Sequence, residues 1–160
     1  MNVKQYFGFL SIIHMALIAG QLVFIAVVLF LLSSGAWEAI LVEKTNLFLI
    51  IIAVATAGGF YLGNFIYGKL LDSIKQLTDF KEQLAKLKVI IIMRLGLLEG
   101  PTFLSILFYL FTGSWYFMVF AVLLVLLFLK LKPNKEQIIS DLELSDEIKK
   151  LLENPDTIVE

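Results

Sequence analysis

Four polar residues within the apolar stretches of this sequence have side chains that could bind an ion. Glu99 lies near the midpoint of a predicted membrane span at 88–111. A charge at that depth costs at least about 2.5 kcal/mol on insertion scales, so the carboxylate needs a partner, water or a bound proton. Arg94 lies five residues earlier in the sequence, about 7.5 Å along a helix that rises 1.5 Å per residue. The candidate ion-binding residues are Glu99, Arg94, His14 and Gln21.

Two interpretations of Glu99 stay open. It is a proton- or cation-binding carboxylate in a transport path, since ionisable residues inside spans often mark such paths. Alternatively, it is a structural side chain, neutral or paired with Arg94, His14 or Gln21, that fixes helix register. Pro101 removes a backbone donor and can expose the carbonyl of Leu97, which could help hold a proton or cation. We expect His14 to be an interfacial or hydrogen-bonded residue rather than a proton relay.

Other chemistry is excluded by composition and motif. The chain has no cysteine and one histidine, which excludes thiolate chemistry and a multi-histidine metal cage. It has no phosphate-binding glycine loop, no HExxH motif and no plausible Ser–His–Asp set. The lysines of the 72–87 connection are interspersed with acids and lack aromatic neighbours, which argues against nucleic-acid binding. We therefore expect no catalytic residue, no metal site and no cofactor.

Small residues recur four positions apart within the apolar stretches. Helix faces that are poor in side chains let backbones approach closely in lipid. These stripes serve either packing within the chain or assembly of a homo-oligomer. The candidate helix-packing residues are Ala16, Gly20, Ala55, Gly59, Gly63, Gly96 and Gly100.

The elements that position these residues follow from composition. The 160 residues are 59% apolar and 17% charged, against about 45–50% and 25% in average soluble proteins. Three long gaps in the charge pattern, the third taken with the apolar stretch before it, hold four stretches that can each form a membrane helix. We therefore predict an all-α polytopic membrane protein. Its four transmembrane helices are expected at about 7–32, 46–71, 88–111 and 115–131.

Lysine and arginine set the expected orientation. Lysines crowd the second connection and follow the fourth span, whereas the first connection carries only Lys44 and the third carries none. The positive-inside rule therefore places both termini and the 72–87 connection in the cytoplasm of a cell membrane, which we take to be a bacterial inner membrane. The first apolar run continues well past a signal-peptide core, so we expect no cleaved signal peptide.

Two predicted cytoplasmic segments flank this transmembrane domain of residues 1–132. In 70–88, apolar residues recur every three or four positions, which predicts an amphipathic helical connection. The tail, 133–160, holds three lysines and eight acidic residues. Pro133-Asn134 and Ser145 can start short helices there, and Pro155 stops the second. The tail is either a solubilising cap folded on the basic connection or a docking motif for a cytoplasmic partner.

An internal repeat relates the two halves of the chain. A shift of 80 residues aligns 12–20 with 92–100, so that small residues match at 16 and 96 and at 20 and 100. Residues that can carry a positive charge also match at 14 and 94. Both copies run in the same direction, which predicts a parallel duplication of a helical hairpin.

The stretch from Arg94 to Phe103, RLGLLEGPTF, resembles the start of the carboxylate-bearing helix in proteolipid c subunits of rotary ATPases. The glycine-rich AVATAGG at 53–59, with Gly63, resembles the first helix of that family. The resemblance covers about residues 50–110 and implies that Glu99 is an ion-binding carboxylate. The chain departs from the family in its longer connection, its missing polar turn motif and its non-alternating glycines. The resemblance therefore does not extend to ring assembly.

Two function hypotheses follow. The first is a small non-enzymatic integral membrane protein, a subunit or accessory protein that packs with partner proteins or with itself. The second is a proton- or cation-binding, proteolipid-like protein that uses Glu99. Nothing in the residues supports an enzyme acting on lipids. The bilayer is a partner in every case.

Overall fold

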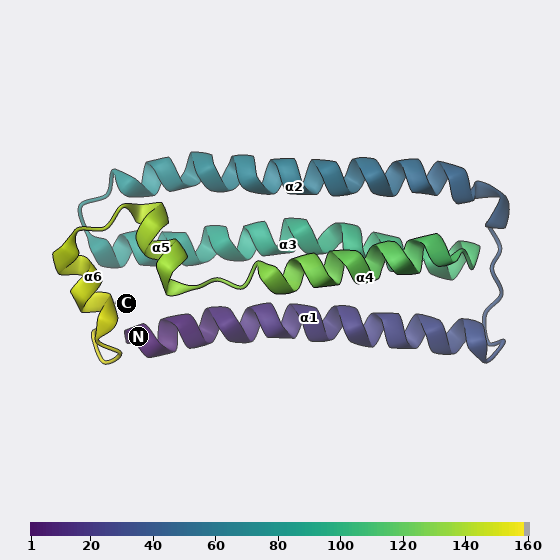
Figure 1. Cartoon of the computed structure of the whole chain (residues 1–160), viewed down its shortest axis with the longest axis horizontal. Helices are drawn as coiled ribbons and strands as arrows, with labels where there is room; N and C mark the ends of the chain where they lie inside the picture. The colour runs from purple at the N-terminus through teal and green to yellow at the C-terminus, as the bar shows by residue number, and fades with distance from the viewer. Residues whose placement is uncertain (159–160) are drawn as a thin grey trace. The chain divides into compact units, whose positions relative to one another are not determined.

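The computed structural model describes residues 1–158, which form helices joined by short connections (Figure 1). The helices are α1 (Val3–Ser33), the short 3-10 helix η1 (Val42–Lys44), α2 (Thr45–Lys75), α3 (Phe80–Thr112), α4 (Trp115–Lys130), α5 (Lys135–Leu142) and α6 (Asp146–Glu153). Over the described residues, the only β-structure is an isolated bridge between Asn2 and Ile158. The all-helical prediction is therefore confirmed.

Three helices, α1, α2 and α3, are long and apolar enough to cross a membrane. The fourth, α4, has 16 residues, fewer than the roughly 20 that a span needs. It passes the same test only together with α5, from which it is bent by 72°. The number of helices that could cross a membrane is therefore three, or up to four if the bent pair is one span.

The predicted helical connection at 70–88 is interrupted. Its first residues extend α2 to Lys75 and its last residues begin α3 at Phe80, so only residues 76–79 lie outside a helix. Asp79 ends the break because its side chain accepts a hydrogen bond from the backbone N–H of Lys81 at 2.9 Å, as residues at helix starts do. The apolar stripe seen in the sequence is thus shared between the ends of two helices.

The chain divides into two compact units. Unit 1 comprises Met1–Met15, Gly63–Leu95 and the tail from Lys132, and unit 2 comprises Ala16–Leu62 and Gly96–Leu131. Each of α1, α2 and α3 contributes residues to both units.

Unit 2 is built around an aromatic core. Phe48 of α2 and Phe108 of α3 stack with ring centroids 4.4 Å apart, and Phe117 of α4 meets Phe108 edge-on at 5.5 Å. Val28 of α1 and Ile52 of α2 are fully buried in the same cluster. Helices α1, α2, α3 and α4 therefore all contribute to this core.

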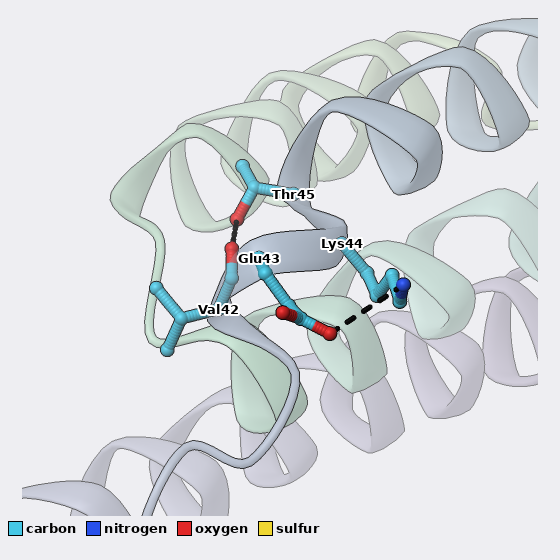
Figure 2. Close-up of polar contacts among 4 residues, drawn as sticks. All are labelled: Val42, Glu43, Lys44 and Thr45. Atoms are coloured by element: carbon cyan, nitrogen blue, oxygen red, sulfur yellow. Dashed lines mark hydrogen bonds and ion pairs between the residues drawn. The ribbon is translucent and has the colours of Figure 1, made fainter.

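Short polar connections close the end of unit 2. Figure 2 shows the turn before α2, where the Thr45 hydroxyl donates to the carbonyl of Val42 at 2.7 Å and Lys44 lies 3.4 Å from Glu43. The connection between α3 and α4 turns at Gly113, whose φ of 65° favours glycine. This turn lies between the predicted spans at 88–111 and 115–131.

Unit 1 holds the tail. Helix α5 begins after Asn134, whose side chain accepts a hydrogen bond from the backbone of Gln137 at 2.7 Å, and α6 begins after Ser145. Ile138 and Leu152 of these helices are almost completely buried. The backbone N–H of Val3 donates to the carbonyl of Thr157 at 3.0 Å, so the tail also contacts the start of α1.

Candidate functional site

Glu99 lies in unit 2, on the side of α3 that faces α1. Its carboxylate is half-buried, and its interacting side chain is Gln21 of α1. Gln21 is 0% exposed, yet neither of its amide atoms has a partner with good hydrogen-bonding geometry. The rings of Phe24 and Phe103, whose centroids are 5.4 Å apart, also join α1 to α3. The Glu99–Gln21 contact is therefore loose and leaves hydrogen-bonding capacity unused.

Two more hydroxyls of unit 2 are buried without a hydrogen-bond partner. They belong to Thr102, one turn after Glu99 on α3, and to Thr56 of α2. Thr56 lines a cavity of about 20 Å³ beside Pro101 and Phe128, which has room for about one water molecule. Unit 2 thus has unsatisfied polar groups on three helices.

Pro101 and Gly59 explain the contact between α2 and α3. Proline removes the N–H that would otherwise bond to the carbonyl of Leu97. A Cβ atom built on Gly59 would lie 2.9 Å from that carbonyl oxygen and 3.3 Å from Cγ of Pro101. Only a residue without a side chain fits there. The carbonyl that we expected to be exposed is therefore covered by the backbone of α2.

The other small residues of α1 and α3 lie at the surface. A Cβ atom on Gly20, Gly96 or Gly100 would meet nothing within 4 Å, and Ala16 is exposed. We call the surface formed by Ala16, Gly20, Gly96 and Gly100 the open face. Of the remaining candidate packing residues, Gly63 is buried and Ala55 is half-buried.

Helix geometry places the open face on one side of the α1–α3 pair. The two helices run in the same direction (Figure 1) and meet at Gln21 and Glu99. Each residue turns a helix by about 100°, so Gly20 lies about 100° before Gln21 and Gly100 about 100° after Glu99. The Gln21 and Glu99 side chains point toward each other on parallel helices, so these two rotations place Gly20 and Gly100 on the same side of the helix pair.

Ala16 and Gly96 lengthen the open face by about one turn along α1 and α3. Ala16 and Gly96 each lie four residues, about one turn, before their partners Gly20 and Gly100. The four residues are the positions that match at a shift of 80 residues.

A different side of α3 is covered by α4. The hydroxyl of Ser105, which lies about 140° round α3 from Gly100, donates to the carbonyl of Phe117 at 2.8 Å. This bond is buried, and it lies away from the open face.

Arg94 lies in unit 1, and the structure gives it partners other than Glu99. Its guanidinium donates to the side-chain oxygen of Asn64 at 2.8 Å and lies over the ring of Tyr67, 4.7 Å from the centroid. The Tyr67 hydroxyl in turn donates to Asp141 of α5. The sequence analysis did not pair Arg94 with Asn64 or Tyr67 and did not identify Asp141. The spacing of Asn64 and Tyr67, one helical turn apart, was the available signal.

His14 also lies in unit 1 and is a buried side chain, 1% exposed. The structure thus brings Gln21 to Glu99 and gives Arg94 a separate set of partners. Within the described residues, no group of three or more histidine or acidic side chains could hold a metal ion.

The fold and the site together define an all-helical protein with apolar helices long enough to cross a membrane, and they place a loosely held carboxylate between two of them. Comparison with protein-family models, curated proteins and solved structures found no significant match.

Proposed function

We propose that this chain is a small non-enzymatic integral membrane protein, a subunit or accessory protein that uses the open face to pack against a partner membrane protein or a second copy. The observation that carries the proposal is the open space around Gly20, Gly96 and Gly100. Packing within the described chain accounts for Gly59 but not for these three glycines.

The physics of helix association in lipid supports this role. Lipid tails are as apolar as leucine, so transmembrane helices associate by close backbone packing rather than by the hydrophobic effect. Two small-residue pairs, Ala16 with Gly20 and Gly96 with Gly100, expose the backbones of neighbouring helices on one side. A third helix can approach both backbones there.

The proposed topology has four membrane helices with cytoplasmic termini in a bacterial inner membrane. The lysine distribution supports this orientation. The short α4 reaches the interface because Lys130 and Lys132 can extend their charged ends into it. The tail, the C-terminal end of α2 and the N-terminal end of α3 then form a cytoplasmic cap.

The mass of the native complex tests the proposal. We expect the affinity-tagged chain, extracted from native membranes in mild detergent, to run in a complex of defined stoichiometry. Gly20→Leu and Gly100→Leu should shift it to the monomer, because leucine fills the open face. Gly58→Leu is the matched control, since a Cβ there also meets nothing within 4 Å but lies on α2. A wild-type chain that runs only as a monomer would contradict the proposal.

A second candidate function is proton or cation binding by Glu99, as the resemblance to proteolipid c subunits implies. The observation that favours it is the unused amide of Gln21 next to the carboxylate. Rapid carbodiimide labelling of Glu99 at neutral pH would support it, because that reagent attacks protonated buried acids. Unchanged ion flux and assembly in Glu99→Gln would remove it.

A further inference from the structure

We infer that the partner that packs on the open face is a membrane helix with one basic side chain at mid-membrane depth, which pairs with Glu99. The inference rests on the proposed function and adds the chemistry of the partner. It follows from the charge of Glu99, from the shape of the surface beside it and from the unused amide of Gln21.

The first step is that Glu99 has no cation of its own. Within the described part of the chain, its side-chain partner is Gln21, a neutral amide. The next basic residue along the sequence is Lys130. Arg94, the basic residue before it, is engaged by Asn64 and the ring of Tyr67. The carboxylate is thus uncompensated, and in a membrane an uncompensated carboxylate is costly.

The second step is the position of Glu99 relative to the open face. Gly96 and Gly100 lie on the same helix, about 60° and 100° round from Glu99 on one side. Ser105, about 240° round, faces α4. Glu99 is half-buried, and these angles place it at the edge of the open face. A helix seated on the glycines would bring a side chain within reach of it.

The third step concerns Gln21. Its side chain is completely buried, and its oxygen and nitrogen make no hydrogen bond of good geometry, even to the neighbouring Glu99, which is costly for an amide. A guanidinium carries five donors and no acceptor. One such group can donate to the exposed part of the Glu99 carboxylate, which the buried Gln21 amide holds only loosely.

The surrounding shape favours a helix over a free cation. A free metal cation needs several oxygen ligands, and calcium takes six to eight. Glu99 and Gln21 supply few oxygen ligands, and the open face beside them consists of glycine and alanine residues. Pairing also lowers the cost of the partner's own buried charge, because each ion supplies the other's counter-charge.

Two synthetic membrane helices test this inference against the full chain in lipid vesicles. One is a leucine- and alanine-rich spanning peptide with a single central arginine, and the other has leucine at that position. The chain has no cysteine, so Ser34→Cys, in the exposed connection after α1, takes one fluorescent label. Energy transfer to labelled peptide then reports binding.

We expect the arginine peptide to bind at least about tenfold more tightly than the leucine peptide, and Glu99→Gln to reduce that ratio to below about twofold. Gly100→Leu should weaken both peptides, whereas Gly58→Leu should weaken neither. Equal binding of the two peptides to the wild-type chain, no binding of either, or an unchanged ratio in Glu99→Gln would overturn the inference. Equal binding that is lost in Gly100→Leu would still agree with the proposed function, so the two failures are distinguishable.

Discussion

Gly59 and Leu97 bring the backbones of α2 and α3 into contact, because a Cβ atom on Gly59 would lie 2.9 Å from the Leu97 carbonyl oxygen. Pro101 leaves that carbonyl without its helical partner, and the Cα–H of Gly59 covers it. Pro101 thus frees a carbonyl on α3, and Gly59 allows the backbone of α2 to approach that carbonyl closely.

This contact predicts that Gly59→Ala destabilises unit 2. The methyl group would press on backbone atoms and on the Pro101 ring, which cannot rotate away, and overpacking of this kind costs about 1–3 kcal/mol. Thermal unfolding in detergent, followed by circular dichroism, measures the effect. Gly58→Ala is the matched control, because its Cβ meets open space and alanine favours the helix. Equal melting temperatures for the two variants would contradict the contact.

A second prediction compares two hydroxyls of α3. Ser105→Ala removes the buried hydrogen bond that the serine hydroxyl donates to the carbonyl of Phe117. We expect the free energy of unfolding to fall by about 1–2 kcal/mol. Thr102→Val removes a hydroxyl that is buried without a partner, so we expect stability to stay the same or increase. Denaturant unfolding of both variants tests this order, and a larger loss for Thr102→Val would reverse it.

A third prediction concerns the link from Arg94 to the tail. Tyr67→Phe keeps the ring under the guanidinium but removes the hydroxyl that donates to Asp141. We expect hydrogen exchange in α5 to become at least about fivefold faster, while exchange around Arg94 changes little. Each hydrogen bond to a charged group contributes about 1.5–3 kcal/mol, which supports an effect of this size. Unchanged exchange in α5 would show that the bond does not hold the tail.

A fourth prediction is a pH dependence of the tail contact. The hydrogen bond from Lys75, and then its charge, hold the pKa of Glu143 below its ordinary value of 4.5. A lowered pKa in the folded state gives stability that is complete above the ordinary pKa and is lost as the pH falls through the lowered one. The contact should therefore hold at pH 7 and weaken below pH 4.5. Both side chains are on the surface, so the effect is small.

Double electron–electron resonance measures this change as the distance distribution between spin labels at Ser73→Cys and Ser140→Cys. The distance distribution should be narrow at pH 7 and broader at pH 3.5. Glu143→Gln should be broader at pH 7 and respond less to acid. A distribution that stays the same at both pH values in the wild-type chain would contradict the role of the ion pair.

The sequence predicted the elements better than their contacts. Long apolar stretches predicted the long helices, and Asn134 and Ser145 marked helix starts correctly, because caps depend on neighbouring residues. The break at 76–79 was missed because the apolar stripe continues through it. Only the cap at Asp79, a local signal, could have shown it.

The site was predicted in part, for a physical reason. Glu99 and Gln21 were identified as polar residues within apolar stretches, and the small residues by their spacing. Neither signal says which helix each side faces. Gly59 packs closely and Gly100 does not, although both belong to stripes with the same spacing. The partners of Arg94 come from α2. The spacing of Asn64 and Tyr67 shows that they share one side of that helix, but not that this side faces Arg94.

Site-specific photocrosslinking in native membranes tests the central claim, that the open face binds another membrane helix, most directly. Val27 is exposed, lies seven residues after Gly20 on the same side of α1, and can be replaced by a photoreactive phenylalanine without filling the glycines. The account predicts a discrete protein adduct from this position that disappears in a Gly20→Leu background and is not formed from Val54 on α2. Adducts with lipid only, or the same adduct from both positions, would contradict it.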